Sequence, residues 1–115
     1  MATLDFSKIR DDSKVIYEIS GRLDTQSTPD FQEEIENCFS ESEKEYENKI
    51  NLVFDFKNVE YMSSAGLRAI LYAKKHIDTM SEGSSMEIIN VSPEVMEIFE
   101  MTGFSDFISL KKINN

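Results

Sequence analysis

Short apolar runs alternate along the chain with longer amphipathic stretches, and this alternation restricts the folds that the sequence can adopt. Three runs have the length and the β-branched and aromatic content of buried strands: 15–19, 50–56 and 86–91. Three stretches repeat their apolar residues every three or four positions, as amphipathic helices do: 28–39, 63–80 and 92–102. Strands that alternate with helices are joined by right-handed crossovers, so we expect these three strands to run parallel.

Two further segments complete the predicted sheet. Residues 4–9 alternate apolar and polar side chains, and the polar turn at 10–13 is short enough to pair this strand antiparallel with 15–19. Residues 107–110 are expected to add a short last strand. We therefore predict a single α/β domain over residues 1–115, with a mixed sheet of four to five strands and three to four helices.

Capping residues and polar pairs predict where the elements begin and end. Thr28 and Ser92 are each followed by proline, a pattern typical of an N-cap residue at a helix start. The polar pair Lys57-Asn58 is expected to end the strand at 50–56. Asp55 would then close that strand at the edge of the sheet.

Charge and composition exclude several classes of function. The chain carries 12 Lys and Arg against 22 Asp and Glu, and a net charge of −10 disfavours binding to nucleic acid or to an anionic membrane. One Cys and one His cannot form an internal disulfide or a structural zinc site. No run approaches the ~20 apolar residues that span a bilayer, and the N-terminus lacks a signal-peptide pattern. We expect a cytoplasmic monomer without metal or cofactor.

The polar residues that follow the strands are expected to share one edge of the sheet. The carboxyl ends of parallel strands meet there, which brings together the segments 21–24, 55–64 and 90–92. The edge lacks a constellation for hydrolysis, because Ser64 has no nucleophile-elbow motif and His76 lies three turns further along the same helix. No glycine-rich nucleotide-binding motif is present either. The residues at this edge therefore give no support for a nucleophilic hydrolase or for a resident nucleotide.

A pair of serines opens the second predicted helix. A hydroxyl at a helix start ordinarily accepts hydrogen bonds from free backbone N–H groups, as a cap. The same N–H groups and the positive end of the helix dipole also stabilise a phosphate. Phosphorylation of Ser64 would therefore leave the fold intact and act on a binding partner. The residues by themselves leave both interpretations open.

Three segments match motifs of a known family. The first is Met62-Ser63-Ser64-Ala65-Gly66-Leu67-Arg68, with Asp55 upstream of it. The second is Gly21-Arg22-Leu23-Asp24, followed by Thr28-Pro29, and the third is Met101-Thr102-Gly103-Phe104. Together with the order of the elements, these segments resemble the STAS domain of bacterial anti-sigma-factor antagonists.

The resemblance implies a protein-binding switch and no enzymatic activity. Such a protein, when unphosphorylated, binds an anti-sigma factor that is also a serine kinase, and a sigma factor is released. The kinase, which holds ATP and Mg²⁺, phosphorylates the helix-opening serine, here Ser64 with Ser63 in reserve, and a PP2C-type serine phosphatase reverses the reaction. The resemblance implies these partner-binding residues: Gly21, Leu23, Asp24, Asp55, Met62, Ser63, Ser64, Gly66 and Leu67.

The serine loop, by which we mean residues 62–68, departs from the clearly phosphorylated members of that family at two positions. In those members the serine is often preceded by Asp and followed by Ser or Thr. Here the two positions hold Ser63 and Ala65. The chain therefore presents two neighbouring hydroxyls, and Ser64 is favoured because it is placed at the helix start.

Two alternative functions remain open at the level of sequence. One is a STAS docking or regulatory subunit of a transporter or signalling assembly, whose binding would not depend on charge at Ser64. The other is a response-regulator receiver with Asp55 as the phosphoacceptor. Against the receiver, Asp11-Asp12 follow an alternating strand instead of a buried one, and no Lys-Pro pair ends a late strand.

Overall fold

The computed structural model describes residues 4–113, which form one mixed sheet with helices on one of its faces. The elements in chain order are β1 (Leu4–Asp11), β2 (Lys14–Leu23), α1 (Thr28–Glu45), β3 (Asn51–Met62), α2 (Ser64–Ile77), β4 (Ser85–Val91), α3 (Pro93–Met101), the 3₁₀ turn η1 (Phe104–Asp106) and β5 (Ser109–Lys112). The strands follow the spatial order β1-β2-β3-β4-β5, with β1 antiparallel to β2 and the other neighbours parallel. The predicted fold class, element order and hairpin are confirmed.

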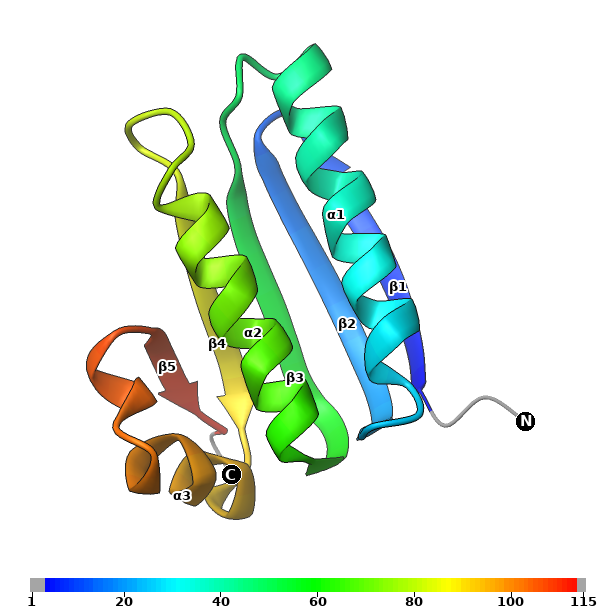
Figure 1. Cartoon of the computed structure of the whole chain (residues 1–115), viewed down its shortest axis with the longest axis vertical. Helices are drawn as coiled ribbons and strands as arrows, with labels where there is room; N and C mark the ends of the chain where they lie inside the picture. The colour runs from blue at the N-terminus through cyan, green and yellow to red at the C-terminus, as the bar shows by residue number, and fades with distance from the viewer. Residues whose placement is uncertain (1–3, 114–115) are drawn as a thin grey trace.

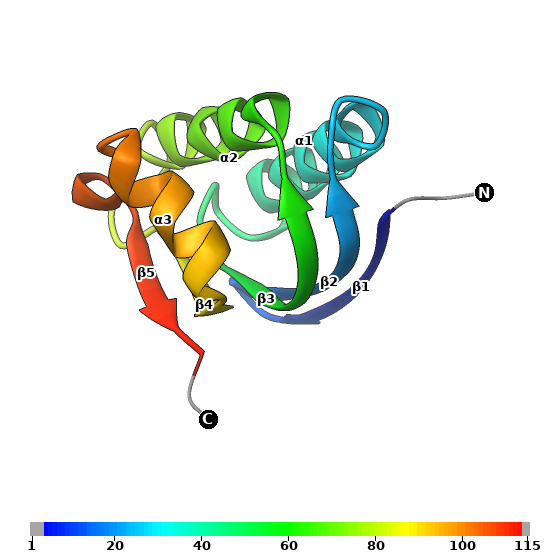
Figure 2. The same ribbon diagram turned by 90° about the horizontal axis from the view of Figure 1, so that it is seen from below.

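Two helices cover the same face of the sheet. In Figure 1, α1 lies over β1 and β2, and α2 lies over β3 and β4. Figure 2 shows both helices on one side of the curved sheet, and no helix formed by residues 4–113 lies over the opposite face of β1, β2 and β3. The third helix, α3, lies at the end of β4 where the parallel strands finish. This end of the sheet is also where α1 and α2 begin.

The core lies between the sheet and the two covering helices. The ring centroid of the buried Phe54 lies 5.5 Å from that of Phe31 on α1 and 6.0 Å from that of Tyr17 on β2. The Tyr17 hydroxyl donates a hydrogen bond of 2.7 Å to Glu34 Oε2. Burial raises the pKa of Tyr17 above its usual value, so the side chain stays a neutral donor. The apolar face predicted for α1 is buried: Phe31, Ile35, Cys38 and Phe39.

The third strand is longer than predicted, and Asp55 does not end it. The expected end at Lys57-Asn58 is wrong, because β3 continues to Met62. Its neighbour β2 continues beside it through two register shifts, so that Leu23 pairs with Met62 and the backbone groups of both strands remain bonded. Pairing with β4 ends at Asp55. The polar pair therefore lies on an exposed part of a continuing strand.

The start of the first helix also differs from the prediction. Its N-cap residue is Ser27, and Thr28 is the first helical residue. The Thr28 hydroxyl and backbone N–H both donate to the Asp24 carbonyl oxygen, at 2.6 and 2.9 Å, so this threonine holds the loop to the helix. The third helix begins as predicted, because Ser92 Oγ accepts a hydrogen bond of 3.3 Å from the Val95 N–H.

The first and last strands deviate by a few residues. β1 runs through Asp11, and the turn narrows to Asp12 and Ser13, where Asp12 adopts a left-handed φ of 52°. β5 begins at Ser109, so Phe107 lies outside the strand and is 65% exposed.

Replacement of Phe54 tests the position of the core. We expect Phe54→Ala to lower the free energy of unfolding by about 3–5 kcal/mol, because it leaves a cavity between the rings of Tyr17 and Phe31. Urea denaturation of the whole chain measures the change. Phe107→Ala is the matched control and should stay within about 0.5 kcal/mol of wild type, since Phe107 is exposed. Equal losses in both variants would contradict this packing.

Candidate functional site

The first turn of α2 lies directly against the end of β2. The Ser63 N–H donates a hydrogen bond of 2.9 Å to the Leu23 carbonyl oxygen. A Cβ atom added to Gly66 would lie 2.7 Å from the same oxygen and 2.8 Å from Leu23 Cγ. Carbon atoms do not approach this closely, so the contact requires glycine at position 66. Strand β2 thereby determines where the serine loop lies.

The two serines at this helix start have different environments. Ser63 is the N-cap residue, and its Oγ accepts a hydrogen bond of 3.2 Å from the Gly66 N–H. Ser64 is the first helical residue, is exposed, and has no side-chain hydrogen bond within residues 4–113. The first turn of α2 contains no acidic residue, so no side-chain charge there offsets the positive end of the helix dipole. From the sequence, a serine hydroxyl at this helix start could be either a cap or a phosphorylation site. In the structure Ser63 is the cap, and the Ser64 hydroxyl is not used as one.

Asp24 shapes the loop that precedes α1. Its Oδ1 accepts hydrogen bonds from the backbone N–H groups of Gln26, at 3.1 Å, and Ser27, at 3.0 Å. The Ser27 hydroxyl donates to the Arg22 carbonyl oxygen at 2.7 Å. The backbone hydrogen bond from Ser27 is the main cause that lowers the pKa of Asp24 below its usual value. Gly21, upstream, has a φ of 106° beside a register shift between β2 and β3.

Most of the predicted partner-binding residues meet at this edge, but several have buried side chains. Four of them belong to the core: Leu23, Met62, Gly66 and Leu67. The side chains of Leu23, Met62 and Leu67 and the backbone of Gly66 support the loop and are not presented to a partner. Ser64 is exposed, whereas Asp24 and Ser63 are half-buried. Fewer residues are therefore accessible to a partner at this edge than the sequence motif suggested.

Asp55 lies away from this edge, contrary to the sequence-based expectation. Its neighbours in β3 are buried against the helices, so strand alternation directs Asp55 to the opposite face of the sheet. Its Oδ1 accepts hydrogen bonds of 3.0 Å from the Lys57 N–H and from Asn90 Nδ2. Roughly 23 Å of strand separates it from Met62 at 3.3 Å per residue. A receiver-type acceptor at a strand end is not formed here.

Several exposed residues beside the serine loop were not predicted. The Arg22 guanidinium carbon lies 4.4 Å from the centre of the Tyr61 ring, which is 42% exposed. Arg68 and Tyr72 follow Ser64 at intervals of four residues, so helical periodicity could have identified them. They lie at a groove between α1 and α2 that is lined by Thr28, Gln32, Ala65, Arg68, Ala69 and Tyr72.

The described residues assemble no catalytic constellation around Ser64. His76 lies at the opposite end of α2, where its ring stacks on Phe39 with centroids 4.3 Å apart. Within residues 4–113, no three His, Cys, Asp or Glu side chains lie close enough to hold a metal ion. No helix in the same range has the length and apolar character needed to cross a membrane.

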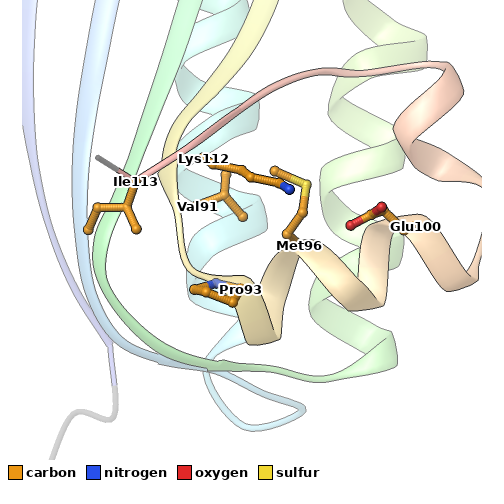
Figure 3. Close-up of a pocket in the computed structure, with 6 residues that line it drawn as sticks. All are labelled: Val91, Pro93, Met96, Glu100, Lys112 and Ile113. Atoms are coloured by element: carbon orange, nitrogen blue, oxygen red, sulfur yellow. The ribbon is translucent and has the colours of Figure 1, made fainter. Parts of the chain in front are cut away.

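A separate hollow of about 180 Å³ lies between α3 and β5. It is lined by Val91, Pro93, Met96, Glu100, Lys112 and Ile113, and Figure 3 shows the Lys112 side chain extending towards Met96. Sites for small-molecule ligands usually enclose about 300–1,000 Å³ and contain several convergent polar groups. This hollow is smaller than that range, so the surface around Ser64 is the stronger candidate site.

Fold and site together define a small α/β domain with an exposed helix-opening hydroxyl and no assembled catalytic groups among residues 4–113. The model of the STAS domain family matches residues 5–115, which is nearly the whole sequence. The chain belongs to the STAS domain family. The family resemblance seen in residues 21–24 and 62–68 is thereby confirmed.

Known relatives agree with this assignment. Proteins named anti-sigma-B factor antagonist in Listeria monocytogenes and Listeria innocua are each 27% identical over 106 residues, covering 92% of this chain and 86% of theirs. The crystal structure of an anti-sigma factor antagonist from Mycobacterium paratuberculosis aligns with a TM-score of 0.77 at 17% identity, covering 94% and 85% of the two chains. Phosphorylated SpoIIAA, a Bacillus cell fate determinant, aligns with a TM-score of 0.68 at 15% identity, covering 92% and 90%. Both structures share the fold.

The two serines should differ in their effect on stability. We expect Ser63→Ala to lower the free energy of unfolding by about 1 kcal/mol, because the Gly66 N–H loses its acceptor. Ser64→Ala should change it by less than about 0.5 kcal/mol, since that hydroxyl has no partner among the described residues. Urea denaturation of the two variants side by side measures the difference. A larger loss of stability in Ser64→Ala than in Ser63→Ala would show that Ser64, and not Ser63, caps the helix.

The sign of the Gly66→Ala effect tests the close approach of α2 to β2. Alanine in a helix interior ordinarily stabilises by about 1 kcal/mol relative to glycine. Here we expect a loss of about 1–3 kcal/mol, because the new methyl group would overlap the Leu23 carbonyl oxygen. Thermal and urea unfolding both report the sign. A stabilised variant would show that the helix does not lie against the strand.

Proposed function

We propose that this protein is an anti-sigma-factor antagonist controlled by phosphorylation of Ser64. In its unphosphorylated form it binds an anti-sigma factor with serine kinase activity, and a sigma factor is freed. The observation that carries the proposal is the exposed Ser64 hydroxyl at the start of α2, beside a separate capping serine. The name shared by the two Listeria relatives and the phosphorylated form of SpoIIAA support it.

The proposed docking surface is the edge around the start of α2. Gly21, Asp24, Ser63 and Ser64 are its accessible members, and these buried residues support them from beneath: Leu23, Met62, Gly66 and Leu67. Asp55 is left out of this surface because it lies on the other face of the sheet. In this proposal the partner binds the side of the molecule that carries Ser64.

The chemistry of the switch requires nothing from this chain except a hydroxyl. The Ser64 oxygen attacks the γ-phosphorus of ATP held by the kinase with Mg²⁺, ADP leaves, and the hydroxyl proton passes to a base of the kinase. A PP2C-type serine phosphatase then hydrolyses the ester with water, which restores the hydroxyl and releases inorganic phosphate. This chain is substrate and ligand in both steps.

A phosphate at this position would act mainly outward. It adds about −1.5 to −2 charges at neutral pH, next to a helix dipole end that favours negative charge. The domain that carries it therefore stays folded. A partner carboxylate ~5 Å away, at an effective dielectric of ~20, would be repelled by about 3 kcal/mol per unit of charge, or about a hundredfold in affinity. A repulsion of this size is enough to separate the complex.

Substitutions at Ser64 test the switch in two ways. With the kinase purified from the source cell, Ser64→Ala should bind as wild type does and gain no phosphoryl mass when ATP is added. Ser64→Asp should bind at least about tenfold more weakly, because the carboxylate supplies part of the phosphate charge. Titration calorimetry and intact-mass spectrometry measure the two effects. Ser63→Ala is the matched control and should still be phosphorylated.

Three results would contradict the proposal. Tight binding by Ser64→Asp would favour a passive docking subunit of a transporter or signalling assembly. Loss of labelling in Ser63→Ala, with labelling kept in Ser64→Ala, would move the acceptor to the reserve serine. Absence of any added phosphoryl group on protein isolated from the source cell under stress and rest would remove the switch altogether.

A further inference from the structure

Arg68 lies one helical turn beyond Ser64 and is exposed on the surface of α2. Side chains four positions apart on a helix are close enough to form ion pairs. The other two arginines of the chain, Arg10 and Arg22, each form an ion pair with a carboxylate. Arg68 forms no ion pair and no side-chain hydrogen bond within residues 4–113. It is a cation without an assigned partner in a chain of net charge −10.

Within residues 4–113, no carboxylate lines the groove at which Arg68 lies. This groove lies between α1 and α2, and its other lining residues are uncharged: Thr28, Gln32, Ala65, Ala69 and Tyr72. The first turn of α2, which separates Arg68 from the strand end, also contains no acidic residue. The neighbouring cation Arg22 stacks on Tyr61 and lies 3.6 Å from Asp24, so it already has partners. Arg68, one helical turn away, is therefore the arginine left to pair with an anion on Ser64.

We propose that the phosphate on Ser64 pairs with Arg68 within the same helix. The inference rests on the proposed function, which places the phosphate on that serine. A phosphate offers several acceptor oxygens, and the planar guanidinium can donate two parallel N–H groups to them. The pair forms along α2 and beside the groove, with no change of fold.

The pairing would change the surface in two places at once. Unphosphorylated protein presents a free guanidinium at the groove, which suits a partner carboxylate. Phosphorylated protein presents new negative charge at Ser64 and a guanidinium that is already occupied. Regulation would then combine repulsion at the serine with loss of a cation one turn away, and Arg68 would act as a positioning residue for the phosphate.

Phosphorus NMR of the whole chain tests the pair without kinase or partner. Phosphoserine is introduced at position 64 during translation, and the second phosphate ionisation is titrated in wild type, Arg68→Gln, Arg68→Lys, Lys75→Gln and Arg22→Gln. Because an adjacent cation favours the dianion, we expect the phosphate pKa to be about 0.5 unit higher in Arg68→Gln than in wild type, a threefold change in proton affinity. Arg68→Lys should fall between them.

Two controls separate the pair from general charge effects. Lys75→Gln removes one positive charge from the exposed surface of the same helix and should leave the phosphate pKa within about 0.1 unit of wild type, since exposed charges at that separation are screened. Arg22→Gln removes the other nearby arginine and should have an equally small effect. Circular dichroism should show that all variants are folded, because each replaced side chain is exposed.

Equal phosphate pKa values in wild type and Arg68→Gln would overturn the inference, as would a rise in Arg22→Gln in place of Arg68→Gln. Either result leaves the proposed function intact, because the encoded phosphoserine bypasses the kinase. Conversely, a shift in Arg68→Gln supports the pair even if the source cell never phosphorylates Ser64, in which case only the proposed function fails. The two hypotheses therefore have separate outcomes.

Discussion

The close approach of helix α2 to the end of strand β2 determines the geometry of the candidate site. Gly66 lies against Leu23 at a distance that excludes any side chain, and the Ser63 N–H is bonded to the same strand end. These two contacts set both the position and the direction of the first helical turn. Because these contacts fix the first helical turn against β2, the Ser64 hydroxyl in that turn is exposed to solvent. A surface defined by a buried backbone contact suits a recognition site, since its shape does not depend on mobile side chains.

Division of work between two adjacent serines follows from this geometry. One hydroxyl satisfies a helix N–H and cannot be modified without loss of a cap, whereas the next is available to solvent. The first turn of α2 contains no acidic residue, and Arg68, one turn further on, has no ion-pair partner among residues 4–113, so the same region is receptive to negative charge. Local electrostatics and backbone satisfaction therefore assign different roles to residues that are chemically identical.

Strand β3 shows how the sheet separates residues that lie close in the sequence. Since β2 continues beside it through two register shifts, β3 extends past the polar pair Lys57-Asn58, which the sequence reads as an end. Asp55 remains in the strand interior, on the face opposite the helices, and is held by Asn90. Asp55 therefore belongs to the same sequence motif as the serine loop, but it does not lie beside that loop in the structure. The N-cap of α1 is Ser27, one residue before the predicted Thr28. The Thr28 hydroxyl is instead bonded to the carbonyl oxygen of Asp24 in the preceding loop.

The sequence alone determined the order of strands and helices, the apolar face of α1, the Ser92 cap and the serine that begins α2. Each of these depends on periodicity or on the chemistry of neighbouring residues, which are local properties. Tertiary structure decided which serine is the cap, how far β3 extends, and which motif residues are buried. These outcomes depend on a neighbouring strand and its backbone hydrogen bonds, and partners distant in the chain cannot be identified from local pattern. Ser64 was identifiable from its place in a motif, but its accessibility follows from the strand that lies beneath the helix.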